Sequence, residues 1–195
     1  MRVIAGSARR AVLDAGPNPG TRPFLELARG ALMNALADRL AGARVLDCYA
    51  GSGALGIEAL SRGAARAVFV EADRGAETAL RGNLRRCGLE ASARVLTGAA
   101  EAILPELAKT GAGGFDLVFV DPPFADAREW PGDPAARIVV RAVERLLAPD
   151  GLLSFRLERG KADPPAWGAL APIRDRRYGR SRIVWYQPVE KADGT

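Results

Sequence analysis

Two short stretches of the 195-residue sequence combine residue types that could bind a small molecule and act on it. Residues 51–56, GSGALG, match the spacing G-x-G-x-x-G, and Asp47 lies four residues before them. Residues 121–124, DPPF, place a carboxylate, two prolines and an aromatic ring in succession. A glycine-rich turn lets the backbone approach a ligand closely, and a carboxylate beside an aromatic ring suits an amine on a flat base.

The glycine stretch by itself is typical of more than one nucleotide-containing ligand. It follows a predicted strand and begins a predicted helix, and Glu71 ends the next strand, so a nicotinamide-binding fold also fits. The Asp47 carboxylate would repel a pyrophosphate, whereas it would attract the sulfonium and ammonium groups of S-adenosylmethionine. Glu71 could accept hydrogen bonds from two ribose hydroxyls in either ligand. The alternative for Asp47 is a structural role, capping the turn that follows.

The DPPF stretch suits methylation of an exocyclic base amine. The lone pair of such an amine is delocalised into the ring, so the enzyme must accept hydrogen bonds from both amine hydrogens. Asp121 offers one acceptor and the Pro122 carbonyl a second, while Phe124 could stack on the base. The sequence has no histidine, which excludes Ser-His-Asp and Cys-His mechanisms, but this reaction needs no covalent nucleophile. A proline turn leaving a strand is the structural alternative.

Strands and helices alternate through the middle of the chain. The predicted strands are residues 44–48, 67–71, 93–97, 115–121 and 151–157, and the predicted helices are 54–62, 74–87, 100–109 and 135–147. This alternation predicts a parallel sheet with helices on both faces. Ligands of such sheets bind beyond the carboxyl ends of the strands, so we expect Asp47, Glu71 and Asp121 to face one crevice.

The two ends of the chain follow other patterns. Residues 1–23 predict a small hairpin, residues 24–40 a helix, and residues 173–175 with 183–186 an antiparallel hairpin at the sheet edge. The predicted organisation is therefore a basic N-terminal extension (1–23), a catalytic domain (24–188) and a flexible tail (189–195).

Charge and composition favour a cytoplasmic protein that binds a polyanion. The net charge is +5, with six arginines against three acids in residues 1–41 and eight basic against three acidic residues in 156–186. Positive surfaces of this kind attract nucleic acid. No apolar run approaches the roughly 20 residues that cross a bilayer. Cys48 and Cys87 have no metal-like spacing and are expected to be reduced core residues, so no metal site is predicted.

Residues 47–56 together with 121–124 resemble the class I S-adenosylmethionine-dependent methyltransferases that modify base amines. More closely, the whole chain resembles the bacterial 16S ribosomal RNA guanine-N2 methyltransferases, through residues 1–6, 21–23, Asn34, 58–64 and 177–179. The resemblance implies a Rossmann-like α/β fold with a seven-stranded, mostly parallel sheet and a reversed final strand. It also implies methylation of one guanine in 16S rRNA within an assembling small subunit, by a monomer that converts S-adenosylmethionine to S-adenosylhomocysteine without a metal.

The resemblance and the motifs together define three sets of candidate residues. The catalytic set is Asp121, Pro122, Pro123 and Phe124. The cofactor-binding set is Asp47, Ala50, Gly51, Ser52, Gly53, Leu55, Glu71, Ala72, Ala99, Ala100 and Asp121. The RNA-binding set is Arg2, Arg9, Arg10, Arg22, Arg29, Arg177, Tyr178, Arg180 and Arg182.

The chain departs from the family pattern in two places. Gly30 stands where the family usually has an acid. After the third strand the family commonly has an Asp or Asn that meets the adenine amine, whereas Gly98 is followed here by two alanines. Glu101 or a backbone carbonyl would take that role.

Three alternatives remain beside the rRNA methyltransferase. A DNA adenine-N6 methyltransferase shares the Asp-Pro-Pro-aromatic motif, although the short gap after Phe124 leaves no room for an added target-recognition segment. A catalytically silent RNA-binding protein on the same fold would explain the altered stretches 24–33 and 98–100. A nicotinamide oxidoreductase is disfavoured by Asp47.

Overall fold

The computed structural model describes residues 1–16, 26–122, 134–158, 167–178 and 181–189. Its chain divides into two compact units, Met1–Ala100 and Glu101–Thr195. No helix in these described stretches is both long and apolar enough to cross a membrane.

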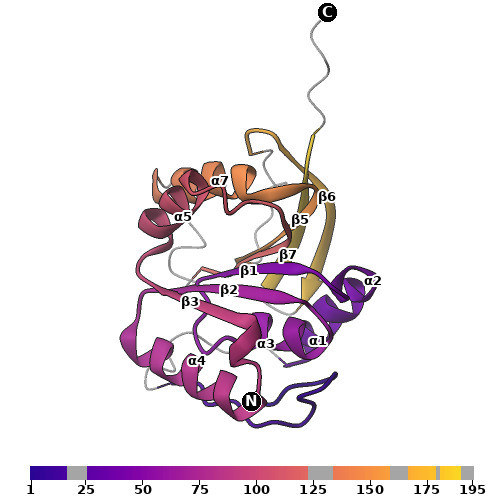
Figure 1. The fold of residues 1–195 in the computed structure, drawn as a ribbon. Helices are drawn as coiled ribbons and strands as arrows, with labels where there is room; N and C mark the ends of the chain where they lie inside the picture. Colours follow the sequence, from indigo (N-terminus) through magenta and orange to yellow (C-terminus); the bar gives the residue numbers. More distant parts are fainter. Residues whose placement is uncertain (17–25, 123–133, 159–166, 179–180, 190–195) are drawn as a thin grey trace, which may run out of the picture. The chain divides into compact units, whose positions relative to one another are not determined.

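The first unit is built on three parallel strands in the order β3-β2-β1 (Figure 1). The strands are β1 (Arg44–Cys48), β2 (Arg66–Glu71) and β3 (Ala93–Thr97). The helices are α1 (Glu26–Ala35), α2 (Ala37–Leu40), α3 (Ala54–Ser61) and α4 (Arg74–Cys87), with a 3-10 turn at Glu90–Ser92. Strand β1 and most of β2 are buried, apolar runs, as expected within a parallel sheet, whereas β3, at the end of the order, has no fully buried residue. Asp47 and Glu71 lie near the same ends of β1 and β2.

Helix α4 shows how local sequence sets the ends of these elements. The Asp73 Oδ1 atom accepts a 2.7 Å hydrogen bond from the Ala76 N–H, which caps the start of the helix. Gly88 ends the helix in the left-handed conformation, with φ of 67°. Both signals lie in the sequence, and the predicted helix 74–87 is confirmed without change.

The second unit contains four strands in the order β4-β5-β7-β6. The strands are β4 (Phe115–Val120), β5 (Leu147–Glu158), β6 (Leu170–Tyr178) and β7 (Ser181–Pro188), and the helices are α5 (Ala100–Lys109) and α7 (Pro134–Leu146). Strands β4 and β5 are parallel, and β7 is antiparallel to both of its neighbours. The predicted C-terminal antiparallel hairpin is therefore confirmed, with longer strands than the sequence indicated.

The structure differs from the predicted elements most clearly in three regions. The expected helix 24–40 is broken at Leu36, which separates α1 from α2. Strand β5 begins at Leu147 rather than 151, because the turn-like residues before Gly151 form an irregularity within the strand pairing: the register jumps from Phe115↔Leu147 to Leu117↔Leu152. At the N-terminus the chain turns at residues 6–10, and the antiparallel pairing there is an isolated bridge between Arg2 and Val12.

The two cysteines differ in their surroundings. Cys48 is buried in β1, as predicted, and burial raises the pKa of its thiol well above the usual value. Cys87, at the end of α4, is half-buried rather than in the core. Both are free thiols.

Candidate functional site

The loop between β1 and α3 has the backbone geometry that its glycines predict. Gly51 and Gly53 have φ of 56° and 82°, in the left-handed region that glycine adopts without strain. A Cβ at Gly53 would lie 2.2 Å from Cδ1 of Leu80 in α4, and one at Gly56 would lie 2.3 Å from Cε1 of Phe69 in β2. The glycines therefore serve both the turn and the close packing of the helices around it. We call residues 50–53 the cofactor loop.

Asp47 holds the start of α3. Its side chain is 1% exposed, and its Oδ2 atom accepts a 2.9 Å hydrogen bond from the Gly56 N–H. A carboxylate at this point also interacts favourably with the positive end of the helix dipole. The capping role that the sequence left open is thus the arrangement the structure shows, and direct contact of Asp47 with a cofactor stays a prediction.

Glu71 fixes the other side of the cofactor loop. Its Oε2 atom accepts a 2.6 Å hydrogen bond from the Gly51 N–H, and its Oε1 atom accepts one of 2.8 Å from the Asp73 N–H. Each carboxylate oxygen has a further lone pair, so these bonds leave acceptor capacity for ribose hydroxyls. Glu71 therefore shapes the loop in addition to its predicted role.

A third side chain that bonds to the cofactor loop was not identified from the sequence. The Nδ2 atom of Asn83, in α4, donates a 2.9 Å hydrogen bond to the Ser52 carbonyl. The signal available in the sequence is a polar amide among apolar neighbours on the helix, since Leu80 and Leu84 are buried beside it. Such a residue is expected to satisfy a buried partner.

The remaining cofactor candidates of the first unit vary in exposure. Ala50, Ser52, Leu55 and Ala100 are buried, Ala99 is half-buried and Ala72 is exposed. The Gly98 N–H donates a 2.9 Å hydrogen bond to the Glu71 carbonyl, so the end of β3 lies beside the end of β2. Contact of the adenine amine with Glu101 or with a backbone carbonyl after β3 stays a prediction.

The second unit contributes Asp121, directly after β4. Its Oδ1 atom forms an ion pair with Nε of Arg156 in β5, and the two side chains are 15% and 9% exposed. Burial raises the pKa of the Asp121 carboxyl above its usual value, while the charge of Arg156 opposes that rise. Sequence reasoning missed Arg156, although an arginine within the apolar run of β5 was a sign of a buried partner. Pro122 is buried.

Pro123 and Phe124 of the predicted catalytic set lie outside the described residues. Arg22 and Arg180 of the predicted RNA-binding set also lie outside them. The stacking role of Phe124 and the phosphate contacts of these two arginines stay predictions.

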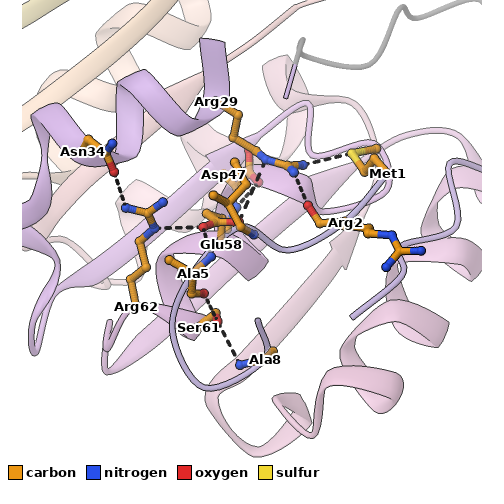
Figure 2. A network of polar contacts seen from close by, with 12 residues as sticks. Met1, Arg2, Ala5, Ala8, Arg29, Asn34, Asp47, Glu58, Ser61 and Arg62 are labelled. Carbon is orange, nitrogen blue, oxygen red and sulfur yellow. Dashed lines mark hydrogen bonds and ion pairs between the residues drawn. The ribbon is translucent and has the colours of Figure 1, made fainter. Parts of the chain in front are cut away.

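The buried carboxylate of Glu58, in α3, contacts N–H donors from three parts of the first unit (Figure 2). Its oxygens accept hydrogen bonds of 2.8 Å from Ile4 N–H, 3.0 Å from Ala5 N–H and 2.8 Å from Arg62 Nε. Arg29 Nε lies 4.0 Å away, and Glu58 is 1% exposed. The network attaches the N-terminal residues to α3 and α1.

Arg29 itself corrects the predicted RNA-binding set. It is 0% exposed, and its guanidinium donates to the Arg2 carbonyl and, at 3.0 Å, to Sδ of Met1 (Figure 2). An arginine enclosed in this way presents no surface to a phosphate. Its ion pair with Glu58 compensates the buried charge.

Arg182 is the second correction. It lies in β7, buried, and Nη2 and Nε donate hydrogen bonds of 2.7 and 2.9 Å to Oδ2 of Asp175 in β6. Four other predicted RNA contacts are exposed as expected: Arg2, Arg9, Arg10 and Arg177. Tyr178 is half-buried, and the exposed Arg174 and Arg176 of β6 were not anticipated.

Comparison with known proteins shows a family over nearly the whole chain. Residues 1–187 match the family model Cons_hypoth95, described as conserved hypothetical protein 95. The chain is 33% identical over 187 residues, 96% of its length and 98% of the relative's, to YlbH of Bacillus subtilis, provisionally named an rRNA methyltransferase. It is 44% identical over 125 residues, 64% of its length, to the Escherichia coli ribosomal RNA small subunit methyltransferase D, covering 60% of that protein.

Solved structures agree with this assignment. The provisionally named methyltransferase yhhF of Escherichia coli superposes with a TM-score of 0.81 at 32% identity, covering 98% of this chain and 99% of that one. The similarity confirms the predicted α/β class I fold with a seven-stranded, mixed sheet. The chain therefore belongs to the Cons_hypoth95 family, and it is a methyltransferase.

Proposed function

We propose that the protein transfers a methyl group from S-adenosylmethionine to the exocyclic N2 amine of a guanine in 16S rRNA. The similarity to relatives named as rRNA methyltransferases supports the RNA substrate. The observation that carries the choice of cofactor is that two backbone N–H groups, one in the cofactor loop and one in the first turn of α3, already have acceptors. Carboxylates of Glu71 and Asp47 accept the hydrogen bonds of Gly51 and Gly56, two N–H groups that a pyrophosphate would need.

The cofactor loop fits a cationic ligand better than a phosphate. Two carboxylates beside the loop favour the sulfonium and ammonium groups, and Glu71 retains lone pairs for ribose hydroxyls. At Gly53 the space that a side chain would fill is already occupied by Leu80, which keeps the loop tight. Bound there, S-adenosylmethionine would supply an electrophilic methyl group and leave as S-adenosylhomocysteine.

Asp121 is the proposed acceptor for one N2 hydrogen, and the Pro122 carbonyl for the other. Drawing both hydrogens into hydrogen bonds turns the nitrogen lone pair out of the ring and toward the methyl donor. The nitrogen gains an extra bond, so one N2 proton leaves afterwards, to Asp121 or to water. Ionised Asp121 is the stronger acceptor for its N2 hydrogen and is the form that can take up the released proton, and the cation of Arg156 favours that state against the effect of burial.

The experiment is methyl transfer from labelled S-adenosylmethionine to small ribosomal subunits and their assembly intermediates, followed by nucleoside analysis of the RNA. We expect N2-methylguanosine, and none with the Asp121→Ala variant as control. N6-methyladenosine would overturn the guanine assignment while keeping the amine chemistry. An absence of any methylated nucleoside would favour a silent RNA-binding protein.

A further inference from the structure

The amide of Asn83 is saturated by partners from two separate segments of the first unit. Its Nδ2 atom donates hydrogen bonds of 2.9 Å both to the Ser52 carbonyl and to the Asp14 carbonyl. Its Oδ1 atom accepts hydrogen bonds of 2.8 Å from the Asp14 N–H and 2.7 Å from Nη1 of Arg86. Asn83 is 0% exposed, so no solvent replaces any of these bonds.

The chemistry of the position requires an amide. A carboxamide offers two donor hydrogens and two acceptor lone pairs, and at Asn83 all four are used. A carboxylate of the same size would lose both donors, and an alanine would lose everything. In either case the Ser52 carbonyl would lose its hydrogen bond from Asn83. Because water does not reach this place, the buried acceptor would stay unsatisfied, which lowers stability.

The two segments joined by Asn83 have different predicted roles. Ser52 belongs to the cofactor loop. Asp14 belongs to residues 1–16, which we call the N-terminal segment and which carries the exposed Arg9 and Arg10 of the predicted RNA-binding set. Figure 1 shows this segment, in indigo, running beside α4. Arg86 adds a 2.9 Å hydrogen bond from Nη1 to the Val12 carbonyl.

We propose that Asn83 is a positioning residue for the cofactor loop, and that it fastens the loop and the N-terminal segment to one point. The cofactor loop then takes its binding-competent shape only when the N-terminal segment is docked on α4, because both depend on the same Asn83 side chain. The inference rests on the proposed function, in that the loop is taken to bind S-adenosylmethionine. It assigns a role to a residue that touches neither substrate nor cofactor.

The first test is steady-state kinetics of Asn83→Ala with saturating small subunits. We expect the KM for S-adenosylmethionine to rise about tenfold, with kcat at saturating cofactor within about twofold of wild type, since the catalytic groups are untouched. Arg86→Met is the matched control: it removes the Arg86 bonds to the Val12 carbonyl and to Asn83 Oδ1 but leaves the Asn83 bonds to Ser52 and Asp14, so its KM should rise clearly less than that of Asn83→Ala. A lower kcat with unchanged KM would mean only that less protein is folded, and would overturn the proposal.

The second test needs no variant and so survives a failure of Asn83→Ala to fold. Hydrogen exchange of the wild-type protein is followed with and without saturating S-adenosylhomocysteine. We expect slower exchange at the Asp14 N–H, which donates to Asn83, when the ligand is bound to the loop. Unchanged exchange there, with ligand binding verified by calorimetry, would overturn the proposal. Absence of any binding would instead overturn the proposed function on which it rests.

Discussion

The cofactor loop and the Asp121 site are stabilised in different ways. Side chains from the end of β2 and from α4 hold the loop backbone through neutral N–H and carbonyl groups, and Asp47 of β1 does the same in the first turn of α3. Asp121 instead faces a full positive charge on Arg156 across an ion pair in a largely buried place. The loop therefore depends on the geometry of its bonds to backbone groups. The Asp121 site depends on a balance of charge and burial, which pH and single charge changes can shift.

The largest expected effect concerns the support of the loop-bearing unit. Glu58→Ala should lower the free energy of unfolding by about 3–5 kcal/mol, because it removes a buried carboxylate that accepts hydrogen bonds from Ile4, Ala5 and Arg62 and that lies 4.0 Å from the buried Arg29. Chemical denaturation measures this loss. Glu106→Ala is the control, since its pair with Lys109 is exposed and should contribute at most about 1 kcal/mol. Equal small losses in both variants would show that the network around Glu58 contributes little to stability.

Asp121→Ala should separate the two sites most clearly. We expect kcat to fall by about 100-fold or more, because the lost hydrogen bond is made mainly in the transition state. Affinity for S-adenosylhomocysteine, measured by calorimetry, should stay nearly unchanged, since the loop does not rely on this residue. A matching loss of cofactor affinity would contradict the division of roles.

Glu71→Ala should weaken cofactor binding, in contrast to Asp121→Ala, which should lower kcat. Removing this carboxylate frees the Gly51 N–H and takes away the proposed ribose acceptor, so cofactor binding should weaken by about 1.5–3 kcal/mol. Isothermal titration with S-adenosylhomocysteine measures the change, with the exposed Glu90→Ala as control. Unaltered affinity would remove Glu71 from the site.

Arg156→Gln should shift a pH profile rather than abolish activity. The reaction needs ionised Asp121, so the rate falls on acidification through the pKa of that carboxyl. Burial raises this pKa and Arg156 lowers it, so removing the arginine raises it further. The acid limb of kcat should therefore move to higher pH, while cofactor affinity stays constant. An unmoved acid limb would show that Arg156 does not control the ionisation of Asp121.

Local patterns predicted the parts of the molecule that depend on neighbouring residues. The strand–helix alternation, the end of α4 at Gly88 and the turn at Gly51 and Gly53 all follow from short-range signals. The Asp47 cap was stated as the alternative to contact with a cofactor, and the packing of Gly56 against Phe69 became evident only in the structure.

The missed features depend on residues distant in the sequence. Asn83 and Ser52 are 31 residues apart, and Arg156 and Asp121 are 35 apart. Helix and strand periodicity extends over a few residues only, so it cannot reveal either pair. Arg29 and Arg182 were predicted to contact RNA from the basic charge near the two ends of the chain and from the family resemblance, neither of which reports burial. Their burial became evident only with Glu58 and Asp175 beside them in the folded chain.

Gly6 has a consequence for the order in which the protein folds. Its φ is 85°, and a Cβ there would lie 1.7 Å from the Ser61 carbonyl oxygen. The backbone of the N-terminal segment therefore packs directly against the end of α3, with no space for a side chain at Gly6. The contacts of this segment close loops of 53 residues, to Ala5 and Ala8, up to 74 residues, at Val12. Loops of that length cost more entropy to close than the turns within α3 and α4. The N-terminal segment is synthesised before α3 and α4, yet it should dock among the last, after the residues that receive it have folded.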